Sequence, residues 1–375
     1  MNFRAMASQY RQELLERVMP FWMRHSLDQE QGGFFSCLDR DGSLYDSRKY
    51  VWMIGRQVWM LAKLYNEVER RPDWLEAATL GMRFLDKHAT RADGQVLFSL
   101  TRDGAPSFLQ RKPYAAVFLA LAMNEYGRAV GDAAYHSQAK RLFAQVRHWI
   151  RHPEELGRPS HGGKPMSQLA DIYVIALLAG ELGEPEWIRP CLDQLDAHID
   201  VERGGIFREN ALVAADSPEA RLFCPGSVFE AGWILLGQTR DTVYREKILS
   251  AIASAHDRGW DQEHGGYFYF MDVEGKPPMQ LEWPMKLWWV HVEALNAFAT
   301  AYQATRDAVW LQRLEMAHEY TWARFPDRKY GEWFAYLDRR GDPTHLLKGG
   351  PYKCCFHVPR ALLLCSNIFD TLASC

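Results

Sequence analysis

Three features of the sequence predict an all-α protein folded as an (α/α)6 barrel, with short β-hairpins at the mouth of a central cavity. Glycine-bearing turns of similar sequence recur about every 60 residues, as in repeat proteins. Stretches with helical periodicity separate successive turns. No sequence pattern predicts a long sheet. About six units of two helices and a hairpin would fill the chain and close into an inner and an outer ring.

The glycine turns define the repeat. The clearest pair is Asp28–Ser36 and Asp261–Tyr269, which share Asp-Gln-Glu-x-Gly-Gly followed by aromatic residues. Each predicts a short strand, a turn and a returning strand. Weaker relatives occur at Asp93–Phe98, Glu202–Phe207, Gly331–Tyr336 and, without a strand-like pattern, His161–Gly163.

Long helices are predicted between the turns. Apolar residues at helical spacing cover Val51–Val68, Ala115–Val130 and Trp288–Thr305. No linker rich in Pro, Ser or Gly divides the chain, so residues 1–375 are predicted to form a single catalytic domain. An open helical solenoid is the alternative arrangement of the same repeats.

Composition excludes several classes of partner. The 375 residues carry a formal net charge of -3, which gives no electrostatic reason to expect nucleic acid or an anionic membrane. The 7 cysteines show no zinc-ligand spacing and indicate free thiols in a reducing compartment. No signal-peptide core or membrane-spanning apolar run occurs, so the sequence predicts a cytoplasmic protein.

The loop Lys348–Arg360 contains the first candidate for catalysis, His357. Paired glycines and two prolines break regular structure around it, and an apolar helical run follows. His357 is therefore expected where a loop meets a helix, a frequent position for catalytic side chains. The ordinary pKa of histidine lies near neutrality, so it can take and return protons.

Two further clusters combine charged and aromatic residues. In Tyr50–Trp59, Arg56 stands among apolar residues and needs a buried carboxylate or a substrate oxygen as its partner. In Phe223–Trp233, Ser227 followed three positions later by Glu230 fits a capping box. Capping alone would account for both residues.

A third cluster, Leu281–Ala294, predicts a helix rich in tryptophan and in charge. Such a helix is expected to be buried, so Lys286, His291 and Glu293 need partners or a ligand. An internal network of ion pairs is the alternative to a substrate site.

Motifs for other chemistries are absent. There is no Gly-x-x-x-x-Gly-Lys-Ser/Thr, no Gly-x-Gly-x-x-Gly after a strand, and no Gly-x-Ser-x-Gly. The pair His148 and His152 lacks the adjacent glutamate of zinc proteases, so a surface pair is expected and no metal site. Proton transfer by His and Glu in an aromatic cavity remains, which suits an open-chain sugar.

The motifs and their order resemble those of the N-acylglucosamine 2-epimerase (renin-binding protein) family, within the sugar 2-epimerases and aldose–ketose isomerases. The resemblance runs nearly end to end and is weakest from about Arg128 to Leu222. The matching segments are Phe21–Ser26, Gly55–Met60, Pro225–Trp233, Gly259–Asp261, His264–Gly266, Leu281–Trp289, Gly331–Phe334, Lys348–Pro351 and Cys355–Arg360.

The resemblance implies an (α/α)6 barrel and acid–base catalysis by two histidines on opposite faces of the sugar. One of them corresponds to His357. Deprotonation of the ring-opened aldehyde at C2 would give an enediol-type intermediate, interconverting N-acylglucosamine and N-acylmannosamine. The expected site residues are catalytic His357, Glu293 and Ser227, with Arg56, Glu230, Trp288, Lys286 and Tyr50 binding the substrate.

One departure leaves the reaction open. The family has Pro-Gly-His where this chain has Pro225-Gly226-Ser227, and a serine hydroxyl has no basic form at neutral pH. A 2-epimerase would need Ser227 to hold a water, or another proton donor. A one-base aldose–ketose isomerase of mannose-like sugars and a sugar-binding protein without catalysis are alternatives. An inverting glycoside hydrolase using two of Glu230, Glu282 and Glu293 would leave His357 without a role.

No cofactor and no metal ion is expected, because acid–base chemistry at C2 needs side chains alone. The resemblance by itself implies a nucleotide effector, for which the sequence holds no phosphate-binding motif. It also implies a homodimer. The expected partner is a small-molecule sugar.

Overall fold

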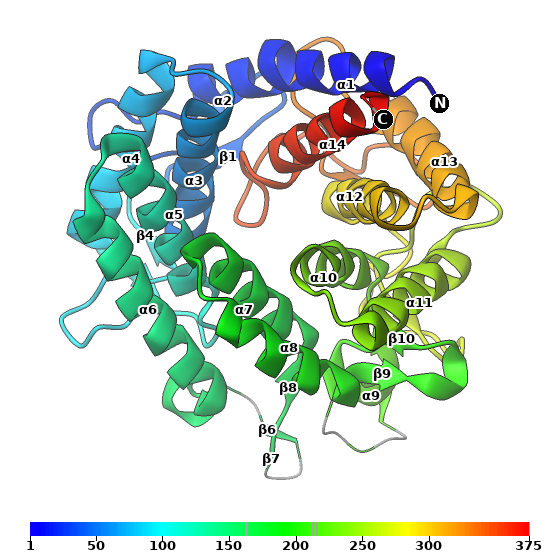
Figure 1. Cartoon of the computed structure of the whole chain (residues 1–375). Coiled ribbons are helices and arrows are strands. Elements are labelled where there is room, and N and C mark those ends of the chain that lie inside the picture. The colour runs from blue at the N-terminus through cyan, green and yellow to red at the C-terminus, as the bar shows by residue number, and fades with distance from the viewer. Residues whose placement is uncertain (159, 162–163, 212–213, 215–216, 375) are drawn as a thin grey trace.

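Two concentric rings of helices make up the protein in the computed structural model, which describes all residues except 159, 162–163, 212–213, 215–216 and 375 (Figure 1). The inner ring consists of α3 (Val51–Glu67), α5 (Tyr114–Val130), α7 (Leu169–Leu182), α10 (Pro225–Gln238), α12 (Trp288–Thr305) and α14 (His357–Ala373). The outer ring consists of α1 (Phe3–Gln12) with α2 (Met19–His25), α4 (Pro72–His88), α6 (Ala133–Arg151), α8 (Ile188–Leu195), α11 (Thr242–Gly259) and α13 (Ala308–Arg324). The predicted (α/α)6 barrel is confirmed.

The apolar pattern of each helix explains its ring. Outer helix α6 buries a single stripe at helical spacing, formed by Ala139, Phe143, Val146 and Trp149. Inner helix α10 is buried on nearly every side. A helix with one apolar stripe covers a core, whereas a helix that is apolar all round lies inside it. The predicted helix Trp288–Thr305 is α12, and the other two predictions match α3 and α5 within one residue.

The ring closes between the two ends of the chain. α1 continues through a π-helical turn, Glu13–Val18, into α2. Figure 1 shows α1 beside α14, and Arg11 of the first helical segment binds Asp370 of α14 at 2.5 Å. This closure excludes the open solenoid. Within the described residues, no helix combines the length and the apolar content needed to cross a membrane.

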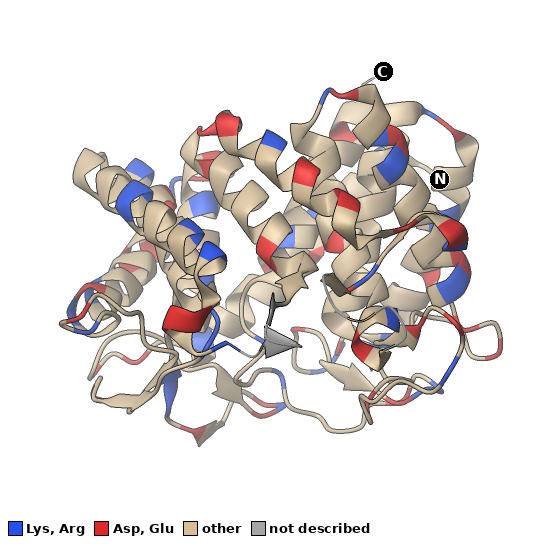
Figure 2. Cartoon of the chain, turned by 90° about the horizontal axis from the view of Figure 1, so that it is seen from below, with Lys and Arg blue, Asp and Glu red and all other residues tan. Residues whose placement is uncertain are grey.

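Short strands and turns gather at one end of the helices (Figure 2). The predicted glycine turns form there, and Gly33 and Gly266 adopt the left-handed φ values of +73° and +72° that favour glycine. Gly162 and Gly163 of one predicted turn lie outside the described residues. The strands are β1 (Cys37–Leu38), β2 (Leu44–Asp46), β3 (Lys49–Tyr50), β4 (Ser99–Leu100), β5 (Pro106–Phe108), β6 (Ser160–His161), β7 (Lys164–Pro165), β8 (Ser167–Gln168), β9 (Ile199–Asp200), β10 (Ile206–Phe207), β11 (Asn210–Ala211), β12 (Leu222–Phe223), β13 (Met271–Asp272), β14 (Lys286–Leu287) and β15 (Tyr336–Leu337).

An ion-pair cluster recurs at the glycine turns. Asp28, the first residue of its turn motif, binds Lys49 Nζ and Arg102 Nε, both at 2.9 Å. Lys49 comes from the strand that leads into the next inner helix, and Arg102 comes from the next repeat. Burial alone would raise the pKa of Asp28, but the two cations hold it well below its usual range. The cluster therefore ties one repeat to the next.

Two further copies of this cluster exist. Asp261 binds Lys286 at 3.0 Å and Arg339 at 2.9 Å. The last copy, at Asp327, binds Lys348 at 2.9 Å and takes its arginine, at 2.7 Å, from the other end of the chain. That arginine is Arg40, in the first repeat. We call the clusters of Asp28, Asp261 and Asp327 the hairpin clusters.

Candidate active site

A cavity of about 560 Å³ lies inside the inner ring, at the end where the hairpins gather. All six inner helices contribute to its wall from their first turn, where helix dipoles are positive and favour an anion. The residues that do so are Trp52, Tyr114, Ala170, Ser227, Trp288 and His357. The barrel thus directs helix N-termini at one enclosed space.

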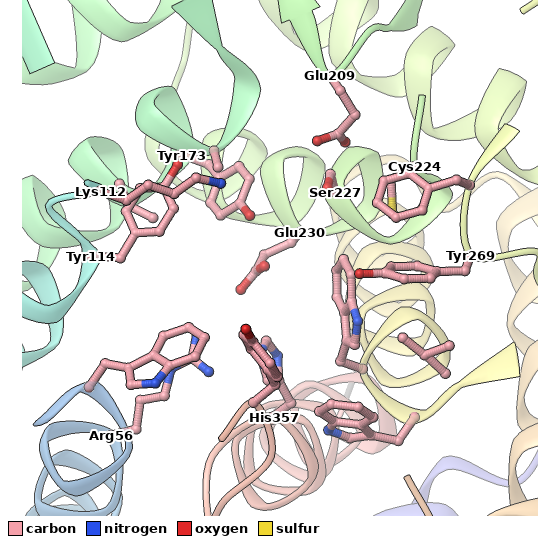
Figure 3. Close-up of a pocket in the computed structure, with 18 of the residues that line it drawn as sticks. Arg56, Lys112, Tyr114, Tyr173, Glu209, Cys224, Ser227, Glu230, Tyr269 and His357 are labelled. Carbon is pink, nitrogen blue, oxygen red and sulfur yellow. The ribbon is translucent and has the colours of Figure 1, made fainter. Parts of the chain in front are cut away.

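His357 is the first residue of α14 and lines this cavity, as predicted (Figure 3). Its Nδ1 lies 2.7 Å from Glu293 Oε1. Among the described residues, none forms a hydrogen bond with its Nε2. Rings from α12 also surround the imidazole, with the Trp289 centroid at 5.9 Å and the Trp288 centroid at 6.4 Å. One nitrogen is therefore held and the other is available in the cavity.

The partners of Glu293 determine the tautomer of His357. Glu293 is fully buried and also accepts hydrogen bonds from Trp233 Nε1 at 2.7 Å and Asn296 Nδ2 at 3.2 Å. A carboxylate surrounded by donors acts as the acceptor, so Nδ1 of His357 carries the proton. Burial lowers the pKa of His357 well below its usual value, and the cations Arg56 and Arg360 add to this while Glu230 opposes it. The imidazole is therefore neutral, with an unprotonated Nε2.

Arg360 links the two carboxylates behind His357. Its Nη2 donates to Glu230 Oε1 and to Glu293 Oε1, each at 2.6 Å. Burial alone would lower the pKa of Arg360, but Glu293 and Glu230 raise it above its usual value. Glu230, Glu293 and His357 present ligand atoms within 4.8 Å of one another, as a metal site would. The Arg360 guanidinium already supplies the cation between both carboxylates, so this group is a poor fit for a metal ion.

Arg56 of α3 lies on the cavity wall among aromatic rings. Its guanidinium carbon is 4.0 Å from the Phe118 centroid, 4.5 Å from that of Trp52 and 4.8 Å from that of Phe356. Within the described residues it forms no salt bridge, and its buried Nε has no hydrogen-bond partner. Burial lowers the pKa of Arg56 to about 10. Its hydrogen-bond donors are free for a substrate oxygen.

The structure corrects the predicted capping box at Ser227. The N-cap of α10 is Cys224, without a side-chain cap, so Ser227 lies inside the first turn. Glu230 is bonded to Arg360 instead of capping the helix. Capping therefore does not explain the presence of Ser227 and Glu230. Both residues line the cavity.

Ser227 lies next to a second titratable group, Glu209. Both residues are on the opposite side of the cavity from His357 (Figure 3). Burial raises the pKa of Glu209 to about 7, and interaction with the Ser227 hydroxyl and the charge of Lys112 limit the rise. The Glu209 Oε1 atom is buried and has no hydrogen-bond partner within the described residues. The cavity thus contains a carboxyl group whose protonation is balanced near neutral pH.

Two predicted substrate-binding residues lie outside the cavity wall. Lys286 is fully buried and bound to Asp261 in a hairpin cluster, which is the internal ion pair considered as the alternative. Tyr50, in strand β3, packs its ring against Phe98 at 5.6 Å. The other predicted residues come together: Arg56, Ser227, Glu230, Trp288 and His357 line the cavity, and Glu293 lies behind His357.

Several residues of the site were not predicted from the sequence. Arg360 follows His357 by one helical turn in an apolar helix, and this spacing was a signal of a buried charge that needs a carboxylate. Glu209 gave no such signal, because it lies in an irregular connection before α10. The unpredicted wall residues include Lys112, Tyr114, Tyr173, Glu209 and Tyr269.

Comparison with known sequences places the chain in a family. It matches the family described as N-acylglucosamine 2-epimerase (GlcNAc 2-epimerase) over residues 33–361. The N-acylglucosamine 2-epimerase of Bos taurus is 43% identical, over 96% of this chain and 90% of that protein. The protein of the same name from Homo sapiens is 39% identical, over 96% of this chain and 89% of that protein.

Solved structures share the fold. The cellobiose 2-epimerase of Spirochaeta thermophila has a TM-score of 0.84 and 22% identity, covering 99% of this chain and 98% of that one. A D-mannose isomerase has a TM-score of 0.82 and 17% identity, covering 97% and 98%. These likenesses confirm the barrel, while the family match and the sequence identities establish descent. This chain belongs to the N-acylglucosamine 2-epimerase family of carbohydrate epimerases.

Proposed function

We propose that this protein interconverts N-acylglucosamine and N-acylmannosamine by moving the proton at C2 of the open-chain sugar. The observation that carries the proposal is the neutral imidazole of His357, held at Nδ1 by Glu293 with Nε2 available in the cavity. The relatives that are 39% to 43% identical carry the name N-acylglucosamine 2-epimerase.

The reaction follows from the geometry. Nε2 of His357 takes the proton from C2, the C–H electron pair forms the C1–C2 double bond, and the negative charge moves to the C1 oxygen. Protonation of C2 from the opposite face restores the C1 carbonyl and inverts C2. Nothing is oxidised or reduced, and the bond between C2 and nitrogen stays intact. We therefore propose that no cofactor or metal ion takes part.

Two features stabilise the negative charge of the intermediate. The inner helices present their positive N-terminal ends to the cavity. Arg56 adds a guanidinium whose Nε has no hydrogen-bond partner among the residues that the structure describes. In an enclosed site such groups favour a developing oxyanion more strongly than water does, because they are already oriented.

The cavity suits one sugar unit. Its volume of about 560 Å³ is in the range of small-molecule sites. Trp52, Trp288 and Trp289 on its wall offer flat apolar faces to the C–H groups of a sugar.

The other reactions have less support. The D-mannose isomerase of Marinomonas mediterranea is 22% identical to this chain, well below the N-acylglucosamine 2-epimerases. The intact pairing of His357 with Glu293 argues against a protein without catalysis. For an inverting hydrolase, the pair Glu230 and Glu293 is too close, since their ligand atoms lie within 4.8 Å and that mechanism needs roughly 6.5–9.5 Å. A pair that includes Glu282, also on the cavity wall, would leave His357 without a role.

The proposal includes a single catalytic domain acting in the cytoplasm as a homodimer. Closure of the ring between Arg40 and Asp327 supports one domain. Six cysteines within the described part of the chain are buried free thiols, which supports a reducing compartment. The dimer, like a nucleotide effector, rests on family resemblance, and light scattering with and without ATP would measure both assembly and its response.

Incubation in deuterated water tests the reaction. N-acetylmannosamine, mannose and a reducing disaccharide are supplied separately, and products are followed by NMR. We expect N-acetylglucosamine carrying deuterium at C2, and no conversion by His357→Ala, whose thermal melting should match that of the wild type. His148→Ala, a change at an exposed histidine, is the control. Fructose from mannose without N-acetylglucosamine would contradict the proposal in favour of the isomerase.

A further inference from the structure

Epimerisation at C2 needs a proton-transfer group on each face of the sugar, and His357 supplies one. We propose that Glu209, acting through the Ser227 hydroxyl, supplies the other. This inference rests on the proposed function. It goes further by assigning the second proton to a carboxyl–hydroxyl pair in place of a second histidine.

The positions of Glu209 and Ser227 in the cavity support this role. Glu209 and Ser227 come from different elements, the connection after β10 and the first turn of α10, and both line the cavity. Figure 3 shows the Glu209 carboxyl directed at Ser227, with both on the opposite side of the cavity from His357. A sugar between these groups would present opposite faces of C2 to them.

The backbone holds Glu209 in place. Its N–H donates to Leu222 O at 2.9 Å, and its carbonyl accepts from Leu169 N at 2.9 Å. The next residue, Asn210, pairs with Gln168 in a short sheet. The backbone at Glu209 is therefore held between the start of α7 and the strand before α10.

The Glu209 carboxyl group differs from the neighbouring carboxylates in its bonding partners. Glu230 and Glu293 are bonded to Arg360, and Asp171 near the cavity is bonded to Arg158 at 3.0 Å. The buried Glu209 Oε1 has no hydrogen-bond partner within the described residues. An unpartnered buried carboxyl oxygen is costly, and such groups concentrate at functional sites. Its pKa of about 7 keeps both protonation states populated, as a group that gives and takes protons requires.

The number of protons is conserved in the proposed reaction. When His357 removes the C2 proton of one epimer, the Ser227 hydroxyl gives its proton to the other face of C2 and receives one from neutral Glu209. His357 ends protonated and Glu209 ionised. The reverse reaction uses these states in the opposite order, with Ser227 taking the C2 proton and passing its own to Glu209. No oxidant, reductant or metal is needed.

Face-specific exchange in deuterated water tests the pair. In Glu209→Gln we expect conversion to fall about 100-fold, the usual scale of general acid–base catalysis. His357 should still exchange the C2 proton of one epimer much faster than it converts that epimer, while the other epimer exchanges and converts only at the residual rate. His357→Ala should show the reciprocal pattern. Loss of packing alone would not produce exchange limited to one epimer.

Controls separate the outcomes. Glu202→Gln, an exposed residue in the same connecting region, should convert both sugars as the wild type does. Ser227→Ala should reproduce the pattern of Glu209→Gln, and full conversion by it would overturn the relay. Wild-type conversion by Glu209→Gln, or its loss of exchange with both epimers, would overturn the inference. A wild-type protein that neither exchanges nor converts either sugar would instead refute the proposed function itself.

Discussion

The hairpin clusters and the cavity wall both contain carboxylates but treat their charge in opposite ways. Asp28, Asp261 and Asp327 each bind a fully buried lysine and a second cation, which holds their pKa low. Glu209 has one carboxyl oxygen with no hydrogen-bond partner in the part of the chain that the structure describes, and burial raises its pKa to about 7. This barrel therefore balances the charge of carboxylates where repeats join and leaves the charge of Glu209 unbalanced in the cavity wall.

Glu293 is intermediate between the two kinds of carboxylate. Arg360 balances its charge, as in a hairpin cluster, yet it also orients His357. A matched carboxylate can thus serve catalysis by holding a base, whereas an unmatched one can exchange the proton itself.

Removing a carboxylate from a hairpin cluster should have the largest effect on stability. Asp28→Asn leaves Lys49 buried without its counter-ion, which costs on the order of 3–5 kcal/mol of unfolding free energy. Because the pKa of Asp28 is lowered, its contribution is present at neutral pH and is lost as pH falls through the folded-state pKa. Urea unfolding at neutral pH measures the loss.

The exposed pair of Asp73 with Arg71 provides the matched control. Asp73→Asn should change stability by less than about 1 kcal/mol. Equal losses of unfolding free energy in both variants would show that the hairpin clusters stabilise the protein no more than surface ion pairs do.

The pH dependence of the reaction tests the titration of Glu209. Conversion in either direction requires that His357 and Glu209 together hold one proton. Above a midpoint near pH 7 Glu209 ionises and the pair loses that proton, so kcat/KM should fall about tenfold per pH unit. His357 has a pKa well below its usual value, so the acid limb lies lower. Residual exchange by Glu209→Gln should lack the alkaline fall.

Neighbouring groups should not produce this limb. Burial raises the pKa of the thiol and hydroxyl groups that face Glu209, so they stay neutral at this pH, and Lys112 supplies a positive charge. These groups are Tyr114, Tyr173, Cys224 and Tyr269. An unchanged alkaline limb in Glu209→Gln would assign the titration elsewhere.

A smaller effect is expected at Arg56, a cation of the cavity wall that forms no salt bridge within the described residues. Arg56→Lys keeps the charge but loses the planar guanidinium that lies over Phe118 and Trp52. We expect kcat/KM to fall about tenfold, mainly through kcat if Arg56 acts on the intermediate. Steady-state kinetics decide this, and a change confined to KM would limit Arg56 to ground-state binding.

The sequence predicted the regular parts of the molecule well. Glycine turns marked the repeat because only a residue without a side chain adopts their left-handed backbone readily. The helical pattern over Trp288–Thr305 also predicted the bounds of α12 to the residue. Pairing between distant residues was harder. Lys286 was assigned to the substrate, although Lys49 and Lys348 occupy equivalent positions in other repeats and bind aspartates in the same way.

Glu209 was beyond sequence reasoning for a physical reason. Its importance comes from a carboxyl group folded back against the first turn of α10, through a segment without helical or strand periodicity. Single-sequence patterns report on local structure and on one buried face. They do not report which loop side chain reaches a cavity.

The bond between Arg40 and Asp327 has a consequence for synthesis of the protein. A chain emerging from the ribosome cannot join its first hairpin to its last until nearly all of it has been made. Such distant contacts form late and cooperatively, because the loop entropy is lost before the contact is gained. His357 comes later still in the chain, so the barrel becomes enclosed and acquires its base in the same final stage of folding.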